Sequence, residues 1–537
     1  MTIYTRPKTI YTRNTSYQLL IWKVVVSILF WIGKWYLQSS LETARKKKKD
    51  EQEYSLDDAI EHIGFGLYQI RLIIVMGLSW IADAIEMTAI SILAPILLCE
   101  WKLNSYEEAL ISIVVFIGFG CGAIFWGIIA DRYGRFKSLF TSSIIVLIFG
   151  VATALSPNLA SVLVLRFFVG FGVGGVSQAV TITTEVLPKS IRTKSALFLL
   201  FFWATGTTLT AALAIFTVSS IGWRWYLGLL SIPVLLFLLA ALFWMPESPR
   251  YLLISNRYEE LFEMLQKMAK MNGKTLPPGS LAKVEYNVNQ GKIFELFLPK
   301  WRWTTVNLMF IWFVLSFSYY GIALLSTEIF QTNINGCNPH YISNFTKTVC
   351  VRLTNKDYVD FMWTCLAEFP GLIVAIFFTE LCSRRMAIVT MLGGSAFSFL
   401  LLSICSSRTI TLIILFGARG LCTGAFQIVY VYTPEVYPTN VRAVGLGFCS
   451  MLSKVGAVIT PFVAQVLIWK SFFWVIGVYT SSLLFAAIFA FLLNIETKGK
   501  LLMNSTFDDI QLNKKKYTEI SDETKYLCEK ENLTLRR

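Results

Sequence analysis

The sequence predicts an all-α integral membrane protein, with twelve transmembrane helices in two six-helix bundles related by a pseudo-twofold axis. Three observations predict this fold class. Hydrophobic residues make up 55% of the 537 residues and charged residues only 15%, which is too little charge for a soluble chain of this size. Many uncharged stretches are long enough to cross a bilayer. The second half of the chain also repeats motifs of the first half at a nearly constant offset.

Six apolar stretches of transmembrane length fit in each half of the chain. In the first half we expect spans at 71–98, 108–130, 138–155, 159–184, 195–219 and 224–245. In the second half we expect spans at 303–326, 358–380, 386–405, 409–433, 443–467 and 472–494. These spans define an N-terminal bundle at 70–246 and a C-terminal bundle at 302–496.

The internal repeat is visible in motifs that lie 249 or 250 residues apart. The matched positions are Glu185 with Glu435, Arg192 with Arg442, Asp131 with Glu380, Arg135 with Arg384, and Glu247 with Glu496. Matches at nearly one spacing indicate a duplicated unit. Duplicated membrane bundles are typical of transporters, which bind their solute where the two units meet.

Positive charge gathers in the loops on one side of the predicted membrane. Basic residues cluster at 45–49, at 132–137 and throughout the central loop 247–301. Among the short alternate loops, 99–107 carries only Lys102, 468–471 only Lys470, and 156–158 no basic residue. The positive-inside rule therefore places the central loop, the N-terminal region 1–69 and the tail 497–537 in the cytosol. The net charge of +14 follows from topology, and we expect no nucleic-acid partner.

A hydrophobic helix is predicted at 19–37, before the first span. Lys23 and Lys34 interrupt it and share one face, since eleven residues make nearly three helical turns. This pattern favours an interfacial helix, and a thirteenth span with snorkelling lysines stays open as an alternative. The central loop contains a second amphipathic run, which we expect to form one or two short helices on the cytosolic face.

The outer loop at 327–357 contains Cys337 and Cys350. Between them, Asn344-Phe345-Thr346 is an acceptor sequence for N-glycosylation. In an oxidising compartment the two cysteines would form a disulfide. The alternative is two free thiols and a chance acceptor sequence.

The segment from Gly127 to Lys137 reads Gly-Ile-Ile-Ala-Asp-Arg-Tyr-Gly-Arg-Phe-Lys. Gly127 and Gly134 permit a close helix approach and a tight turn. Asp131 can cap a helix N-terminus in the other half and pair with an arginine. This segment resembles the loop signature between helices two and three of the major facilitator superfamily. The resemblance implies a latch on the cytosolic side that forms in one conformation and breaks in another.

Two arginines, Arg166 and Arg419, lie inside spans four and ten. They resemble arginines of the sugar-porter branch, where such residues pair with the glutamates that end the same region, here Glu185 and Glu435. The resemblance implies a network of gating residues on the cytosolic side, and static salt bridges are the alternative. The gating residues that it implies are Gly127, Asp131, Gly134, Arg135, Arg166, Glu185, Arg192, Glu247, Arg419, Glu435, Arg442 and Glu496.

A longer resemblance covers roughly 56–500. The segments Ala82–Met87, Gly222–Trp225, Phe317–Gly321, Glu368–Gly371 and Tyr430–Pro438 are similar to those of the synaptic vesicle 2-related proteins. This resemblance implies a vesicle membrane, and the plasma membrane stays open. The second-half loop at 380–385 lacks the glycine of the first, so we expect its latch to be weaker.

Asp83 and Glu86 lie in the first span, three residues apart and therefore on one helix face. Two carboxylates this close repel when both are charged, which favours a proton on one of them. The pair is a candidate for proton coupling or for holding a cationic solute. The alternative is a static bridge, for example between Asp83 and Arg166.

Glu368 precedes Pro370 and Gly371, where a broken helix would expose carbonyl groups to a cavity. Together with Lys454, the groups at membrane depth comprise three acids and three bases, so the sequence does not fix the sign of a solute's charge. The aromatic residues best placed to stack on an organic solute are Trp203, Tyr319 and Tyr320.

The sequence does not predict an enzyme, a metal site or a cofactor. His62 and His340 are the only histidines, and no phosphate-binding glycine-rich loop is present. We expect a transporter that moves a small organic solute, an organic ion or a sugar-like molecule, by alternating access. Its partners would be the lipid bilayer, the solute and protons. The alternative is a non-transporting vesicle receptor or trafficking protein that retains the fold.

Overall fold

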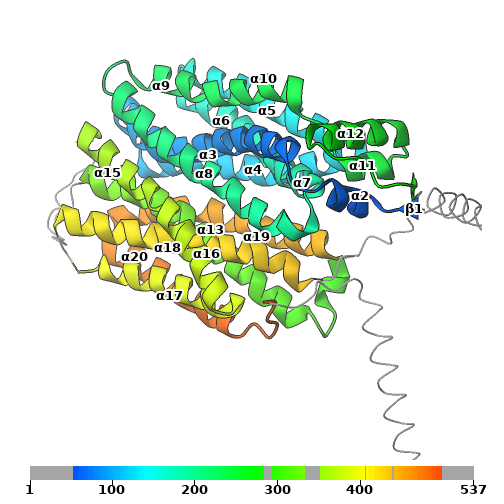
Figure 1. The fold of residues 1–537 in the computed structure, drawn as a ribbon. Helices are drawn as coiled ribbons and strands as arrows, with labels where there is room; N and C mark the ends of the chain where they lie inside the picture. The colour runs from blue at the N-terminus through cyan, green and yellow to red at the C-terminus, as the bar shows by residue number, and fades with distance from the viewer. Residues whose placement is uncertain (1–52, 283–292, 333–350, 405–406, 438–440, 499–537) are drawn as a thin grey trace, which may run out of the picture. The chain divides into compact units, whose positions relative to one another are not determined.

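The computed structural model describes residues 53–282, 293–332, 351–404, 407–437 and 441–498 (Figure 1). The predicted helix at 19–37 and the loop residues Cys337, Asn344 and Cys350 lie outside the described residues, as does the side chain of Arg192. The described residues divide between two compact units. One contains 53–64 and 265–282, and the other contains 65–264 and 293–498.

The smaller unit contains a short sheet that the sequence did not predict. Strand β1 (Glu53–Tyr54) pairs in parallel with β2 (Ser280–Leu281). Helix α2 (Leu56–Ile63) begins at Ser55, whose hydroxyl accepts from the backbone N–H of Asp58 at 3.2 Å. This cap satisfies an N–H group that would otherwise lack a partner.

The expected helices of the central loop are present. They are α11 (Pro249–Ile254) and α12 (Tyr258–Met271). Leu252, Leu261 and Leu265 of the amphipathic run are buried, whereas Phe262 is exposed. The run therefore forms one buried face, with Phe262 outside it.

The larger unit contains two sets of long helices (Figure 1). We call α3 to α10 the N-terminal half: α3 (Leu67–Trp101), α4 (Ser105–Tyr133), α5 (Arg135–Ala154), α6 (Leu159–Val173), η1 (Gly174–Val176), α7 (Ser177–Val186), α8 (Lys189–Thr217), α9 (Trp223–Leu230) and α10 (Ile232–Trp244). We call η2 to α20 the C-terminal half: η2 (Ile293–Phe297), α13 (Arg302–Thr332), α15 (Asn355–Leu366), α16 (Glu368–Leu381), α17 (Arg384–Leu401), α18 (Arg408–Val436), α19 (Arg442–Pro461), η3 (Phe462–Val466), η4 (Leu467–Trp469) and α20 (Phe472–Phe491).

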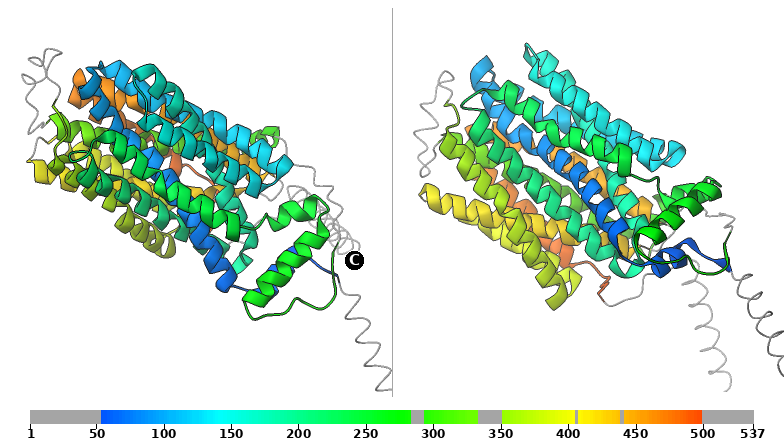
Figure 2. Two further views of the ribbon diagram at one scale, coloured as in Figure 1. Left: turned by 90° about the horizontal axis from the view of Figure 1, so that it is seen from above. Right: turned by 45° about the horizontal axis from the view of Figure 1, so that its top comes forward.

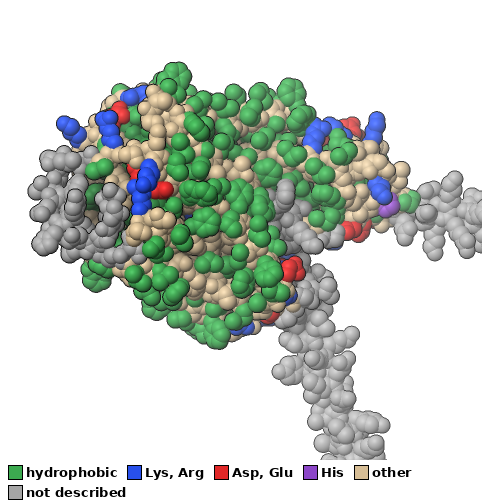
Figure 3. Space-filling model, turned by 60° about the vertical axis from the view of Figure 1, so that its left-hand side comes forward, with side chains coloured by type: hydrophobic (Ala, Val, Ile, Leu, Met, Phe, Trp, Pro, Cys, Tyr) green, Lys and Arg blue, Asp and Glu red, His purple; other side chains and the backbone are tan. Residues whose placement is uncertain are grey.

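Eleven helical segments of the described chain are long and apolar enough to cross a membrane. The ninth predicted span corresponds to α17, which has only 18 residues and begins with two arginines. Those charges lower its mean hydropathy, so it is not among the eleven. Large hydrophobic side chains cover most of the face in Figure 3, as a lipid-facing surface requires. The chain is thus a multi-pass membrane protein.

Helix ends are set by short-range signals. Asn104 caps α4 by accepting from the N–H groups of Tyr106 and Glu107, both at 3.0 Å. Gly134 separates α4 from α5 with a φ of 113°, a conformation that side chains disfavour. Helix α13 ends at Thr332, six residues beyond the expected end at 326.

Most packing occurs between helices of the same half. In the N-terminal half α4 packs on α6, and α3 on α8; in the C-terminal half α13 packs on α19, and α17 lies against α18 and α20 (Figure 2). The halves meet where α4 contacts α19 and α8 contacts α15. The division into two bundles with a pseudo-twofold axis stays a prediction.

The halves share an apolar cluster at the ends of the helices that the charge pattern places outside the cytosol. It contains Ile92 and Leu97 of α3, Trp223 of α9, and Tyr358 and Phe361 of α15, all buried. Because the cluster draws on both halves, it closes the extracytosolic ends of these helices in this conformation.

Candidate functional site

Two glutamate–arginine pairs lie at membrane depth, one in each half. Glu86 of α3 accepts from Arg166 of α6 at 2.8 Å, and the side chains are 3% and 1% exposed. Glu368 of α16 accepts from Arg419 of α18 at 2.8 Å, with 0% and 1% exposed. Buried ions of this kind persist only when each charge has its partner.

A chain of hydrogen bonds links the second pair to the N-terminal half. The indole N–H of Trp203 in α8 donates to the Tyr319 hydroxyl at 2.7 Å, and that hydroxyl donates to Glu368 Oε1 at 2.8 Å. Thr207, one turn beyond Trp203, donates to Glu368 Oε2 at 3.4 Å. The Glu368 carboxylate therefore accepts hydrogen bonds from residues of both halves.

A third acid and a third base lie at the same depth. Asp83 is 6% exposed and interacts electrostatically with Lys454 of α19. The Lys454 ammonium lies 3.5 Å from the centre of the Phe119 ring, a cation–π contact. Tyr320 packs against Phe116 of α4 with the ring centres 4.7 Å apart. These contacts again join the two halves.

Several buried donors in this region have no hydrogen-bond partner among the described residues. They are Trp80 Nε1, Arg166 Nε and Nη2, and Arg419 Nη1. Trp80 packs edge-on against Trp203, with ring centres 5.8 Å apart. Buried polar groups normally have partners, so this region can accept a water molecule or a ligand that carries oxygen acceptors.

The expected pairing of Arg166 with Glu185, and of Arg419 with Glu435, is wrong. Nineteen residues separate the first two along one helical segment, which is about 28 Å at 1.5 Å per residue. The arginines instead meet glutamates of neighbouring helices. The alternative bridge from Arg166 to Asp83 is also wrong, since Arg166 binds Glu86.

Glu185 and Glu247 belong to a cluster at the end of the N-terminal half that the charge pattern places in the cytosol. Glu185 forms an ion pair with Arg135 and accepts from the Ser248 hydroxyl. Glu247 Oε1 accepts from the backbone N–H groups of Arg135 and Phe136, at 2.8 and 3.0 Å. A carboxylate at the first turn of α5 is stabilised by the unpaired N–H groups and by the helix dipole.

The C-terminal half contains the same cluster. Arg384 contacts Glu435 at 3.3 Å, and Thr497 donates to Glu435 at 2.7 Å. Glu496 accepts from the backbone N–H of Arg384 at 2.9 Å. Burial alone would raise the pKa of Glu496, but backbone donors including Lys498 and Arg384 outweigh it and lower the pKa. The Arg384–Glu435 pair is more exposed than Arg135–Glu185, with side chains 20% and 19% exposed against 16% and 8%; the weaker latch expected for the 380–385 loop stays a prediction.

Two predicted gating residues, Asp131 and Gly127, differ from expectation. Asp131 lies within α4, is exposed and has no hydrogen bond or ion pair within the described ranges, so it caps no helix here. Gly127 borders open space, since a Cβ there would meet no atom within 4 Å; its role in close packing is wrong for this conformation. Arg442 donates from Nε to the carbonyl of Tyr437 at 3.3 Å.

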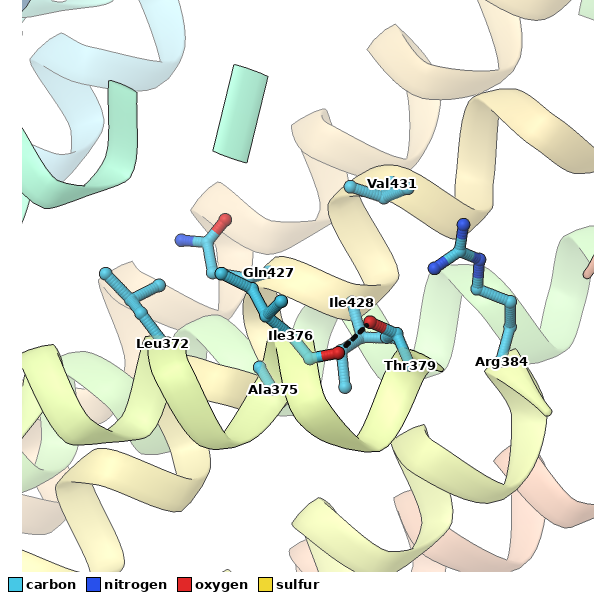
Figure 4. A pocket seen from close by; sticks show the side chains of 8 residues that line it. All are labelled: Leu372, Ala375, Ile376, Thr379, Arg384, Gln427, Ile428 and Val431. Carbon is cyan, nitrogen blue, oxygen red and sulfur yellow. Dashed lines mark hydrogen bonds between the residues drawn. The ribbon is translucent and has the colours of Figure 1, made fainter. Parts of the chain in front are cut away.

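A small hollow lies between α16 and α18 (Figure 4). The Gln427 amide and the Arg384 guanidinium lie at its opposite ends, and Thr379 donates to the Ile376 carbonyl at 2.7 Å. Its walls come from the C-terminal half alone. It therefore lies beside the residues that join the two halves, and not among them.

Sequence reasoning missed other buried polar residues. Thr207 carries no charge, so nothing marked it as a partner of Glu368. Glu108 and Glu328 lay at or beyond the expected ends of spans two and seven, yet both are fully buried. Cys99 is disulfide-bonded, which the sequence did not indicate.

The family described as "Sugar (and other) transporter" matches residues 99–507. The synaptic vesicle 2-related protein of Bos taurus is 43% identical over 463 residues, covering 85% of this chain and 83% of that protein. The putative transporter svop-1 of Caenorhabditis elegans is 41% identical over 466 residues, covering 86% and 89%.

Among solved structures, the chain is similar to the xylose transporter XylE from E. coli in a partially occluded inward open conformation. It is 18% identical, with a TM-score of 0.64, and the match covers 81% of this chain and 100% of that chain. At this identity the similarity supports the fold alone. The all-α fold class predicted from the sequence is confirmed.

Proposed function

The chain belongs to the sugar (and other) transporter family of the major facilitator superfamily, and on that premise we propose that it moves a small organic solute across a vesicle membrane by alternating access. The halves rock about a site at the bilayer midplane, which opens first to one side and then to the other. The class of solute, the coupling ion and the vesicle location of the membrane are all parts of this proposal.

The observation that carries the proposal is the hydrogen-bonded chain from Trp203 through Tyr319 to Glu368. It joins α8 of one half to α13 and α16 of the other at membrane depth. A contact that crosses the division between moving halves must break and re-form during each cycle. A solute that competes for the Tyr319 hydroxyl would therefore bias the equilibrium between conformations.

The chemistry of the site favours a solute rich in oxygen acceptors, such as a sugar-like molecule or an organic ion with hydroxyl or carbonyl groups. The donors without partners are an indole and two guanidinium groups. Glu86 and Glu368 already neutralise Arg166 and Arg419, so the site does not require a strongly charged solute. The Trp80 and Trp203 rings provide an apolar wall for the flat face of such a molecule.

Screening for thermal stabilisation of the purified full chain by sugars, organic ions and nucleotides would identify a ligand. Uptake of that ligand into proteoliposomes would then test transport. Tyr319→Phe removes the hydroxyl that accepts the hydrogen bond from Trp203, and we expect about tenfold weaker affinity for the solute, the effect of losing one hydrogen bond. The matched control is Tyr479→Phe, because the Tyr479 hydroxyl contacts Thr460 within the C-terminal half. Equal effects of the two substitutions would count against the site.

Proton coupling through Asp83 or Glu86 is a further part of the proposal. Uptake should depend on an imposed pH gradient, and Glu86→Gln should remove that dependence while leaving exchange of solute in place. A Glu86→Gln variant that keeps its full gradient dependence would exclude Glu86 as the coupling residue.

The alternative of a non-transporting receptor is favoured by one observation, the greater exposure of the Arg384–Glu435 pair, at 20% and 19%, than of the Arg135–Glu185 pair, at 16% and 8%. A looser clamp in one half suits a protein that no longer cycles. A ligand that stabilises the protein but never accumulates in proteoliposomes would support the receptor.

A further inference from the structure

Lys454 is a cation at membrane depth with no ion pair or hydrogen bond in the part of the chain that the structure describes. It lies in α19, twelve residues after Arg442, or about 18 Å along the helix. That distance places it near the middle of a hydrocarbon core about 30 Å thick. Arg166 and Arg419, at the same depth, each contact a glutamate at 2.8 Å. Lys454 therefore differs from both arginines in lacking a direct counter-charge.

The contacts of Lys454 place its ammonium between the two halves. Nζ lies 3.5 Å from the centre of the Phe119 ring of α4. A Cβ at the adjacent Gly120 would lie 3.7 Å from the Lys454 Cβ, so α4 and α19 approach closely here. Asp83 of α3 attracts the ammonium without forming an ion pair with it. Since an aromatic ring covers only one side of an ammonium that carries three N–H donors, those donors are available to a ligand.

The exposed part of Lys454 borders a space between the halves. The side chain is partly exposed although it lies deep in the membrane. The lipid-facing side of α19 contains Met451, Val455 and Ile459, all exposed, whereas the Lys454 ammonium lies against α4 of the other half. A charge in contact with acyl chains is costly, so intramembrane lysines face the protein interior or a water-filled cavity. A solute that enters between the halves can therefore reach this ammonium.

Aromatic contacts connect Lys454 to the midplane site. Phe116, about one helical turn from Phe119 on α4, packs against Tyr320 with ring centres 4.7 Å apart. The Tyr320 ring meets the Tyr319 ring edge-on at 5.2 Å, and the Tyr319 hydroxyl belongs to the hydrogen-bonded chain of that site. Tyr320 is partly exposed, as Lys454 is. A solute that contacts Tyr319 can thus extend along these rings toward the ammonium.

We propose that Lys454 binds an anionic group of the solute, and that the solute is a small organic anion such as a carboxylate. The ammonium donates charge-assisted hydrogen bonds to the carboxylate oxygens, which are stronger than those it would make to an uncharged hydroxyl. The anion competes with the Phe119 ring for the ammonium, and so loosens a contact between the halves. This inference rests on the proposed function and adds the sign of the solute's charge to it.

Matched pairs of probes would test the proposal by thermal stabilisation of the full chain in detergent micelles. Each pair is a carboxylate with its own amide: benzoate with benzamide, cyclohexanecarboxylate with cyclohexanecarboxamide, and hexanoate with hexanamide. Glucose is the uncharged sugar in the same series. We expect at least one carboxylate to stabilise the protein, and its amide to bind about 10- to 100-fold more weakly, because the amide cannot accept hydrogen bonds with a full negative charge.

Substitutions of Lys454 assign the effect to this residue. Lys454→Met keeps a long side chain beside Phe119 but removes the charge, and it should weaken carboxylate binding about 10- to 100-fold. Lys454→Arg keeps the charge and should restore most of the affinity, which a purely structural role of the lysine would not explain. Lys470→Met is the matched control, since Lys470 is exposed beyond η4, and its carboxylate affinity should equal that of the parent protein.

Three results would overturn the assignment. In the first, Lys454→Met binds a stabilising carboxylate as tightly as the parent protein. In the second, glucose or an amide stabilises the protein and no carboxylate does, which removes the anion and leaves the proposed function intact. In the third, no probe stabilises the protein; uptake of some other, uncharged solute into proteoliposomes would then preserve the proposed function, and the absence of any uptake would overturn both.

Discussion

Replacement of Glu368 by leucine should lower the free energy of unfolding by about 3–5 kcal/mol, the usual cost of breaking a fully buried ion pair. Glu368 accepts two hydrogen bonds from Arg419, at 2.8 and 3.0 Å, and one from Tyr319 at 2.8 Å. A neutral hydrogen bond contributes about 1 kcal/mol, so the larger part of the loss comes from Arg419. Its guanidinium is 1% exposed and would remain charged without its partner.

The double variant Glu368→Leu/Arg419→Met isolates this cause. Removing both charges leaves no unpaired ion, so we expect most of the lost stability to return. Arg224→Met is the control for an exposed pair, since Arg224 and Glu100 are 3.6 Å apart with side chains 48% and 38% exposed. A pair of this kind contributes about 0–1 kcal/mol.

The free energy can be measured by reversible unfolding of the purified protein in mixed micelles, followed by tryptophan fluorescence. The reasoning would be refuted if Glu368→Leu cost no more than Arg224→Met, or if the double variant were less stable than Glu368→Leu alone. The second outcome would mean that Arg419 stabilises the fold through contacts other than Glu368.

Two predictions concern stability elsewhere. The pKa of Glu496 is lowered in the folded state, so the contribution of Glu496 to stability is present above the ordinary pKa of 4.5 and is lost as the pH falls through the lowered pKa. The thermal unfolding midpoints of Glu496→Gln and of the parent protein should therefore differ at pH 7 and converge near pH 3. A difference that stays constant with pH would contradict this. A Cβ at Gly371 would collide with the backbone of α18, so Gly371→Ala should cost about 1–3 kcal/mol. Gly393→Ala, where a Cβ meets no atom within 4 Å, should be neutral or stabilising by up to about 1 kcal/mol; equal losses at the two glycines would argue against close packing of α16 on α18.

Hydropathy predicted the positions of the long helices because a span must be apolar over its whole length. It was less informative at the ends, where polar residues continue a helix. Helix α13 continues to Thr332, and Glu328 therefore lies inside it rather than in the expected outer loop. The two-residue strands of the smaller unit are too short for any periodic pattern to reveal them.

The identity of the charged partners could not be predicted from spacing along the chain. The sequence marked Arg166 and Arg419 as costly charges that need partners, and that inference agrees with the two buried pairs. The sequence pointed to the wrong glutamates as partners of these arginines, because the packing of neighbouring helices determines which side chains meet across their interface. Glu86 was singled out for its proximity to Asp83, yet its contact with Arg166 depends on how α3 and α6 lie together.

Each of the two cytosolic clusters is made by residues of one half of the chain. The partners Arg135, Glu185, Glu247 and Ser248 all lie within 113 residues of one another in sequence, and none comes from the second copy. A single copy of the repeated unit would already contain every residue that forms this cluster. Each cluster is therefore complete within its own half, and the contacts that need both halves lie elsewhere, where α4 meets α19 and α8 meets α15.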